Sequence, residues 1–212
     1  KMERNVAFAM ATVAGTLAKM AFDACMFNCQ NFQFVKLPKE CTTGSSIMPH
    51  KKNPDVFELI RAKSNQLQAL PTQITMIMNN LPCGYFRDLQ QIKEVFLPAF
   101  DELSDCLQMA AYIINKMEVN EHILDDPRYD PMFSVEEVNQ LAANGTPFRD
   151  AYKKVGLEIE AGEFKPNKDI HHTHEGSIGN LCNDKIQELM ENTLSEFHFE
   201  RMENAEKELL GR

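Results

Sequence analysis

Fifteen consecutive residues decide how this sequence is interpreted: Gly44-Ser45-Ser46-Ile47-Met48-Pro49-His50-Lys51-Lys52-Asn53-Pro54-Asp55-Val56-Phe57-Glu58. They run from a loop of small residues, through two lysines, into a long segment of helical periodicity. Asn53 is predicted to be the N-cap and Pro54 the first helical residue, where its missing N–H costs nothing. Unpaired backbone N–H groups and the positive end of the helix dipole then lie just beyond Lys51 and Lys52, which favours binding of a carboxylate or phosphate.

Other interpretations apply to the same residues. A Gly-Ser-Ser loop followed by lysines is also typical of an ordinary solvent-exposed helix start, so spacing alone leaves an anion site and an exposed turn equally open. A phosphate-binding P-loop is excluded, because that motif needs a second glycine directly before the lysine and this sequence has His50 there. The two serine hydroxyls beside the lysines provide groups that can transfer a proton.

The stretch is similar, at every specified position, to the signature Gly-Ser-Ser-x-Met-Pro-x-Lys-x-Asn-x-x-x-x-Glu of the fumarase/aspartase superfamily. This resemblance implies an all-α fold, with a long-helix bundle of the fumarase/aspartase type followed by a small C-terminal helical domain. It also implies an enzyme that eliminates fumarate from a succinyl-type substrate without a metal or organic cofactor.

Two further segments narrow the resemblance to one family. Residues 81–93 read Leu-Pro-Cys-Gly-Tyr-Phe-Arg-Asp-Leu-Gln-Gln-Ile-Lys, and residues 145–151 read Gly-Thr-Pro-Phe-Arg-Asp-Ala. Both look like the argininosuccinate lyase family, and the similarity covers nearly the whole chain, although it is weak after about residue 163. The implied substrate is argininosuccinate, with arginine and fumarate as products. Another succinyl lyase, such as adenylosuccinate lyase, and a catalytically silent helical scaffold stay open as alternatives.

The resemblance implies catalytic roles for residues of the signature. Ser45 would be the general base that removes the proton beside the succinyl carboxylate, and Ser46 is the alternative base. Lys51 and Asn53 would stabilise the negative charge that develops on that carboxylate. Glu58 would orient a catalytic histidine, or it is an ordinary exposed charge on a helix.

The resemblance also implies substrate-binding residues in the second segment, namely Tyr85, Gln90 and Lys93. Gln90 and Lys93 are predicted to share one helix face at a spacing of three residues. The alternative for Tyr85 is an aromatic side chain that packs a loop.

Charge and composition exclude several kinds of partner. Residues 1–117 carry 12 basic and 10 acidic side chains, a net charge of +2, and residues 118–212 carry 10 and 21, a net charge of −11. So little basic surface argues against nucleic-acid binding and favours a small anionic substrate. The six cysteines form no disulfide-like or metal-like pattern, which favours free thiols in a reducing cytoplasm. The segment His171-His172-Thr173-His174-Glu175 is interpreted as a polar surface loop rather than a metal site.

Periodicity predicts mostly helices. The uncharged run from Asn5 to Ala18 is too short for a membrane span and is expected to be buried on most sides within a bundle. Two long helices are predicted, over 54–79 with a kink at Pro71 and over 86–117 with a kink at Pro98. A shorter helix is predicted to start at Ser134, which forms a capping box with Glu137. Two more helices are predicted over 147–162 and 180–210. Residues 32–35 alternate like a short strand.

The domain boundary is expected near residue 118, giving the C-terminal part of a central helical bundle over 1–118 and a small helical domain over 119–212. The abrupt apolar start predicts that the sequence is the C-terminal portion of a longer protein. The resemblance implies a homotetramer whose active sites combine segments of different subunits, and a general acid that lies upstream of Lys1. We therefore expect the 212-residue chain by itself to be inactive.

Overall fold

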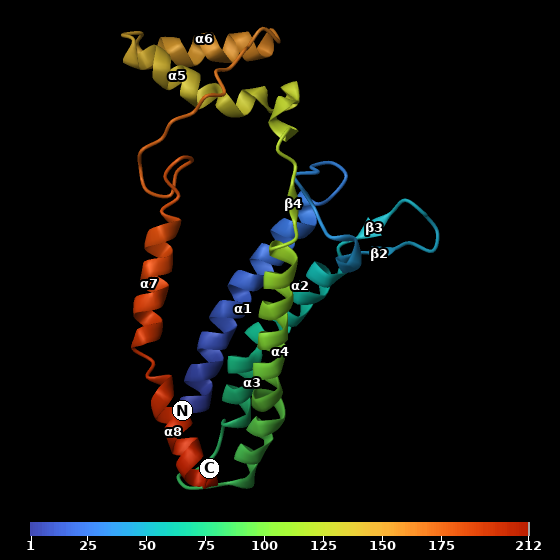
Figure 1. Ribbon diagram of the computed structural model, residues 1–212, viewed down its shortest axis with the longest axis vertical. Helices are drawn as coiled ribbons and strands as arrows, with labels where there is room; N and C mark the ends of the chain where they lie inside the picture. Colours follow the sequence, from blue (N-terminus) through green and yellow to red (C-terminus); the bar gives the residue numbers. More distant parts are fainter. Residues whose placement is uncertain (212) are drawn as a thin grey trace. The chain divides into compact units, whose positions relative to one another are not determined.

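The computed structural model describes residues 1–211. The chain divides into two compact units, Lys1–Asp125 and Asp126–Arg212 (Figure 1). Helices account for 65% of it, and its strands are two-residue pairs without a closed sheet. The prediction of an all-α fold is therefore confirmed.

Four α-helices build the first unit, namely α1 (Met2–Phe27), α2 (Asp55–Gln68), α3 (Leu70–Ile77) and α4 (Ile92–Ile114). The face of α1 that packs on its neighbours is lined by alanines, and Ala7, Ala14 and Ala21 are fully buried. Such small side chains let the α2 and α3 backbones approach α1 closely. Close helix contact of this kind gives a densely packed bundle core.

The core of this unit has two clusters along the bundle. One cluster joins Leu17 of α1, Phe57 and Ile60 of α2, and Ile113 of α4. It lies directly beneath the start of α2, so the part of the helix that follows the signature lysines rests on well-packed side chains. The second cluster joins α1, the end of α2, α3 and α4 around the fully buried Ile74.

The long helix predicted over 54–79 is two helices, broken at Ala69. Pro71 lies within the first turn of α3, where its missing N–H is tolerated, and its ring prevents a continuous helix through the preceding turn. The predicted cap is also wrong, because Asn53 is in a strand and the N-cap residue is Pro54, with φ −82° and ψ 44°. Helix α2 begins one residue later than expected, at Asp55.

The helix predicted over 86–117 is shorter than expected. Residues Arg87–Gln91 form the 3₁₀ helix η2, and α4 follows it with Pro98 inside. The predicted strand is also displaced: β1 is Val35–Lys36, and it pairs antiparallel with β4, Glu118–Val119. The reason is local, since Gln33 has a φ of 52°, which no extended strand adopts.

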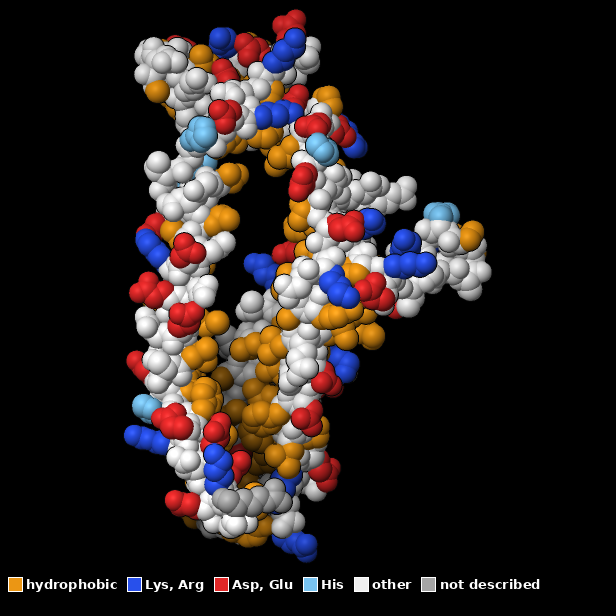
Figure 2. Space-filling model, viewed as in Figure 1, with side chains coloured by type: hydrophobic (Ala, Val, Ile, Leu, Met, Phe, Trp, Pro, Cys, Tyr) orange, Lys and Arg blue, Asp and Glu red, His pale blue; other side chains and the backbone are white. Residues whose placement is uncertain are grey.

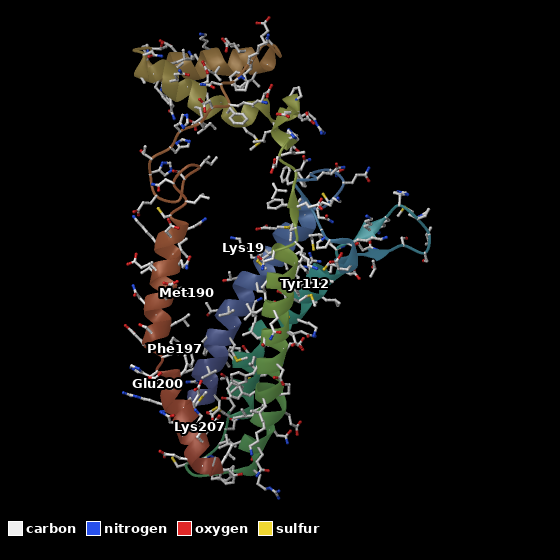
Figure 3. All side chains as sticks on the ribbon, in the orientation of Figure 1. Lys19, Tyr112, Met190, Phe197, Glu200 and Lys207 are labelled. Atoms are coloured by element: carbon white, nitrogen blue, oxygen red, sulfur yellow. The ribbon has the colours of Figure 1, made fainter. Side chains whose placement is uncertain are left out.

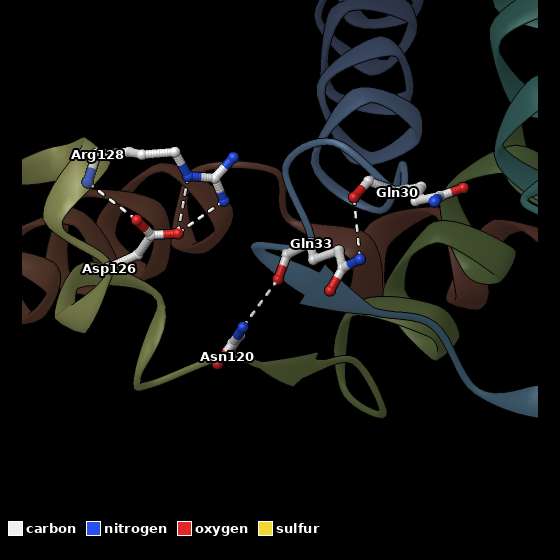
Figure 4. Close-up of polar contacts among 5 residues, drawn as sticks. All are labelled: Gln30, Gln33, Asn120, Asp126 and Arg128. Carbon is white, nitrogen blue, oxygen red and sulfur yellow. Dashed lines mark hydrogen bonds and ion pairs between the residues drawn. The ribbon is translucent and has the colours of Figure 1, made fainter.

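Side-chain bonds reinforce the contact between β1 and β4. Asn120 Nδ2 donates to the carbonyl oxygen of Gln33 at 3.2 Å, and Gln33 Nε2 donates to the carbonyl oxygen of Gln30 at 2.9 Å (Figure 4). Lys36 forms an ion pair with Glu118 at 2.8 Å. These bonds fasten residues just beyond position 118 to the first unit, whose contacts continue to Asp125.

The second unit begins with the 3₁₀ helix η4 (Pro127–Phe133), followed by α5 (Ser134–Ala143) and α6 (Phe148–Glu160). Asp126 caps η4 by accepting the Arg128 N–H at 2.9 Å, and it also accepts from the Arg128 guanidinium (Figure 4). The predicted capping box at Ser134 is wrong: η4 runs directly into α5, so Ser134 is already helical and makes no cap bond. The core of α5 and α6 is the cluster Val138, Ala151, Val155 and Phe164.

The helix predicted over 180–210 is likewise divided, into α7 (Asn183–Ser195) and α8 (Phe199–Leu210). Helix α7 ends at Ser195, and His198, with a φ of 50°, is the N-cap residue from which α8 starts in a new direction. Neither helix has a buried residue, and the exposed apolar side chains include Met190 on α7 and Phe197 between α7 and α8, both labelled in Figure 3.

Helix α1 is long and apolar enough to span a membrane by length and composition, alone among the helices of residues 1–211, with a mean hydropathy of 1.3. A core helix passes the same test, and α1 packs against α2, α3 and α4. The expectation that α1 is buried on most sides is not met within this chain, since Phe8, Val13 and Phe22 are exposed. In Figure 2 hydrophobic side chains gather over the lower part of the bundle.

Candidate functional site

The signature residues form a hairpin that projects from one end of the bundle (Figure 1). Strand β2 (Thr43–Gly44) pairs antiparallel with β3 (Lys52–Asn53), with Thr43 opposite Asn53 and Gly44 opposite Lys52. Residues 45–51 form the loop between the strands. Asn53 Nδ2 also donates to the carbonyl oxygen of Gly44 across the hairpin, at 3.4 Å.

Ser45 is the first residue of this loop. Its Oγ accepts hydrogen bonds from the backbone N–H groups of Ile47 at 3.2 Å and Met48 at 3.1 Å. Hydrogen bonds donated to an oxygen stabilise its negatively charged form, so these two donors favour ionisation of the Ser45 hydroxyl. Ser46, the alternative base, is exposed.

A pocket of about 1100 Å³ lies at the base of the hairpin, wholly within the first unit. Lys51, Asn53 and Glu58 line it, so the structure brings these three predicted site residues together. Ser45 is not among the residues that line the pocket. The other walls come from the end of α1, from β1 and from β4.

The charges at the pocket are mixed. Lys36 and Glu118 compensate each other in their ion pair, while Lys51 forms no ion pair with any residue of 1–211. The first turn of α2 carries Asp55 and Glu58. Their negative charges already compensate the positive end of the helix dipole, so less of it is available to attract a bound anion. An anion bound here would therefore depend on Lys51 and its neighbours more than on the helix terminus. The sequence predicted that the lysines and the helix terminus would attract the anion together.

Sequence reasoning missed several residues of the pocket. Cys25, Asn28 and Cys29 come from the end of α1 and the turn after it, and Glu118 comes from β4. Burial raises the pKa of the Cys25 thiol above its ordinary value, with a nearby Arg61 opposing and Glu58 reinforcing the shift. The four-residue spacing of the two cysteines was the signal in the sequence, but nothing in it connected that spacing to the signature loop.

The predicted substrate-binding residues lie elsewhere. Tyr85, Gln90 and Lys93 are in and after the turn between α3 and α4, at the end of the bundle opposite the hairpin (Figure 1). Gln90 Nε2 donates to the Tyr85 hydroxyl at 2.8 Å, and all three side chains are exposed. Gln90 belongs to η2 and Lys93 to α4, so the two residues do not share a single helix. Within one chain, the structure does not bring this set to the pocket.

The histidine-rich segment is a loop of the second unit. His172 pairs with Glu136 at 3.3 Å, and His171 pairs with Asp169 at 3.1 Å. No group of three or more His, Cys, Asp or Glu side chains within residues 1–211 is arranged to hold a metal ion. All six cysteines are free thiols, of which Cys83 is exposed.

Comparisons with known proteins show what this chain is similar to. A family model described as "Lyase" matches residues 4–69, which include the α1 wall of the pocket and the whole signature. The chain is 74% identical over all 212 residues to a protein of Bacteroides fragilis named argininosuccinate lyase, of which it covers 47%. A protein of the same name from Parabacteroides distasonis is 68% identical over 210 residues, with 47% covered. The chain thus spans about half the length of these relatives.

Solved structures with low sequence identity share the fold. A fumarate lyase:delta crystallin from Brucella melitensis has a TM-score of 0.62 at 20% identity, over 76% of this chain and 35% of its own. A class II fumarase from Schistosoma mansoni has a TM-score of 0.55 at 17% identity, over 76% and 36%. Together with the hairpin signature and the helical bundle, these matches lead to one conclusion: the chain is similar over its whole length to the C-terminal portion of proteins named argininosuccinate lyase, and it shares the helical fold of the solved fumarate lyase and fumarase structures.

Proposed function

We propose that this chain is part of an argininosuccinate lyase, which eliminates fumarate from argininosuccinate and releases arginine. The observation that carries the proposal is the match at 74% identity over the whole chain to a protein with that name. The hairpin supports it, because it presents the signature serine, lysine and asparagine around a loop of residues 45–51.

In the proposed reaction, Ser45 Oγ removes the proton from the carbon beside the succinyl carboxylate. The N–H groups of Ile47 and Met48 stabilise the ionised oxygen that this step needs. The electrons of the C–H bond move into the carboxylate, which gains a second negative charge. Lys51 supplies a positive charge and Asn53 a hydrogen-bond donor to that group.

The carbon–nitrogen bond then breaks as the electrons return to form the double bond of fumarate. The departing guanidinium nitrogen takes a proton from a general acid that we place outside this chain. Glu58, which lines the pocket, orients the catalytic histidine in this scheme. Because Ser45 does not line the pocket, the loop must bring Oγ to the substrate carbon when substrate binds.

The position of the second residue set supports a homotetramer. Tyr85, Gln90 and Lys93 lie at the opposite end of the bundle from Lys51, so one chain cannot use both sets on one small substrate. We propose that these residues contact a substrate in a site formed with another subunit. The central bundle would be residues 1–118 and the small domain 119–212, in a cytoplasmic enzyme that uses no metal or organic cofactor.

The test is an assay of the full-length protein with argininosuccinate and adenylosuccinate side by side, following the absorbance of fumarate. We expect turnover of argininosuccinate only. Turnover of adenylosuccinate instead would identify another succinyl lyase, and no turnover of either by a correctly folded protein would favour a silent scaffold. The isolated 212-residue chain should show no turnover, because the general acid of the proposed reaction lies outside it.

A further inference from the structure

The hairpin that carries Ser45 has few contacts of its own. It consists of two residue pairs, and no third strand joins it in the part of the chain that the structure describes. A two-stranded hairpin of this size is at best marginally stable in water. Something outside the hairpin must therefore hold Gly44 and Ser45 in place.

Asp55 supplies that connection. Its Oδ1 accepts a hydrogen bond from the backbone N–H of Thr43 at 3.0 Å. Thr43 is the first residue of β2 and lies two residues before Ser45. The bond therefore joins the strand that leads into the loop to the helix that follows it.

The helix side of this bond is rigid. Asp55 is the first residue of α2, where free backbone N–H groups and the helix dipole favour a carboxylate. Phe57 and Ile60, in the same first turns, are 1% and 3% exposed in the bundle core. The carboxylate thus transmits the fixed position of α2 to β2.

We propose that Asp55 is a positioning residue for the serine loop. By accepting the Thr43 N–H it fixes β2, and hence the place from which Ser45 Oγ reaches the substrate carbon. Asp55 does not contact the substrate. The inference rests on the proposed function for its kinetic consequence, but not for its structural one.

A displaced catalytic group slows the chemical step more than it weakens binding, since small errors of position already cost about 100-fold in rate. Lys51 and Asn53 belong to the β3 side of the hairpin, which joins α2 directly, so binding of the carboxylate depends less on Asp55. The signature of a positioning role is therefore a fall in kcat with little change in KM.

The experiment compares three variants of the full-length protein: Asp55→Ala, Asp55→Asn and, as a matched control, Asp150→Ala. Asp150 is an exposed aspartate in the first turn of α6, so its removal reproduces the loss of a helix-terminal charge away from the hairpin. Asparagine keeps an acceptor oxygen for the Thr43 N–H. The readouts are amide hydrogen exchange of residues 43–53, and kcat and KM for fumarate release.

In Asp55→Ala we expect faster exchange of the Thr43 amide and a fall in kcat of about 10- to 100-fold, with KM within about 3-fold. Asp55→Asn should keep most of the protection of the Thr43 amide from exchange and most of kcat. Asp150→Ala should match the parent protein in exchange, kcat and KM. Unchanged exchange at Thr43 in Asp55→Ala would overturn the proposal whatever the activity is. Unchanged kcat, or an Asn variant as impaired as the Ala variant, would also overturn it. If the parent protein releases no fumarate, the proposed function fails, while the exchange result still decides whether Asp55 fixes β2.

Discussion

Removing the Phe57 ring tests whether the core beneath the signature hairpin is packed as described. Phe57 is 1% exposed and is the largest of the fully buried side chains. Truncation of a buried phenylalanine to alanine costs about 3–5 kcal/mol, which combines lost burial of the ring with the cavity left behind. Since a domain is stable by only about 5–15 kcal/mol, Phe57→Ala should remove a large part of the free energy of unfolding.

The assay is urea denaturation of the 212-residue chain, followed by helical circular dichroism. With a slope of about 2 kcal/mol per molar urea, a loss of about 4 kcal/mol lowers the midpoint by about 2 M. Leu59→Ala is the control on the same helix, because Leu59 is 58% exposed and should cost less than about 1 kcal/mol. A Phe57→Ala cost below about 1 kcal/mol, or equal costs for the two variants, would refute the described packing.

Three other predictions concern buried groups and pH. The Ser64 hydroxyl is fully buried without a hydrogen-bond partner among residues 1–211, so Ser64→Ala should leave the melting temperature unchanged or raise it; a clear decrease would contradict this. Burial raises the pKa of the Cys106 thiol above about 9, so at pH 8.5 iodoacetamide should modify the exposed Cys83 first, as mass spectrometry would show; equal rates would contradict this. The hydrogen bond from the Arg128 side chain lowers the pKa of the Asp126 carboxyl. The stability that this pair contributes is therefore present above the ordinary carboxyl pKa and is lost as the pH falls through the lowered pKa. An NMR titration in which Asp126 titrates at its ordinary value would contradict this.

The helical bundle was predictable because its signals are local and periodic. Apolar residues at steps of three and four marked α2, α3 and α4, and Pro71 marked the interruption between the first two. The ends of helices were not predictable to the residue. Asn53 has the side chain of an N-cap, but pairing of its backbone with Thr43 takes it into a strand.

In the second unit, too, the helices were predictable but their ends were not. Ser134 and Glu137 fit a capping box in sequence, but the 3₁₀ helix that ends at Phe133 continues into α5 and leaves no helix start to cap. The break between α7 and α8 contains no proline or glycine that would have predicted it, and it includes a left-handed backbone conformation at His198.

The candidate site was predictable only in part. Lys51, Asn53 and Glu58 are close in sequence, and the structure places them on one pocket. The pairing of β1 with β4 joins residues 35–36 to 118–119, and no periodic signal in the sequence reports such a distant contact. The hydrogen bond from Thr43 to Asp55 was invisible for a different reason, since an aspartate in the first turn of a helix is already explained by the helix dipole.

The most direct test of the central claim replaces each signature serine in the full-length protein, as Ser45→Ala and Ser46→Ala, and measures kcat for fumarate release. A general base accelerates proton transfer by about 10²- to 10⁴-fold, so we expect Ser45→Ala to lose activity in that range with unchanged folding, and Ser46→Ala to lose far less. Normal turnover in Ser45→Ala, or an equal loss in Ser46→Ala, would contradict the assignment of Ser45 as the base.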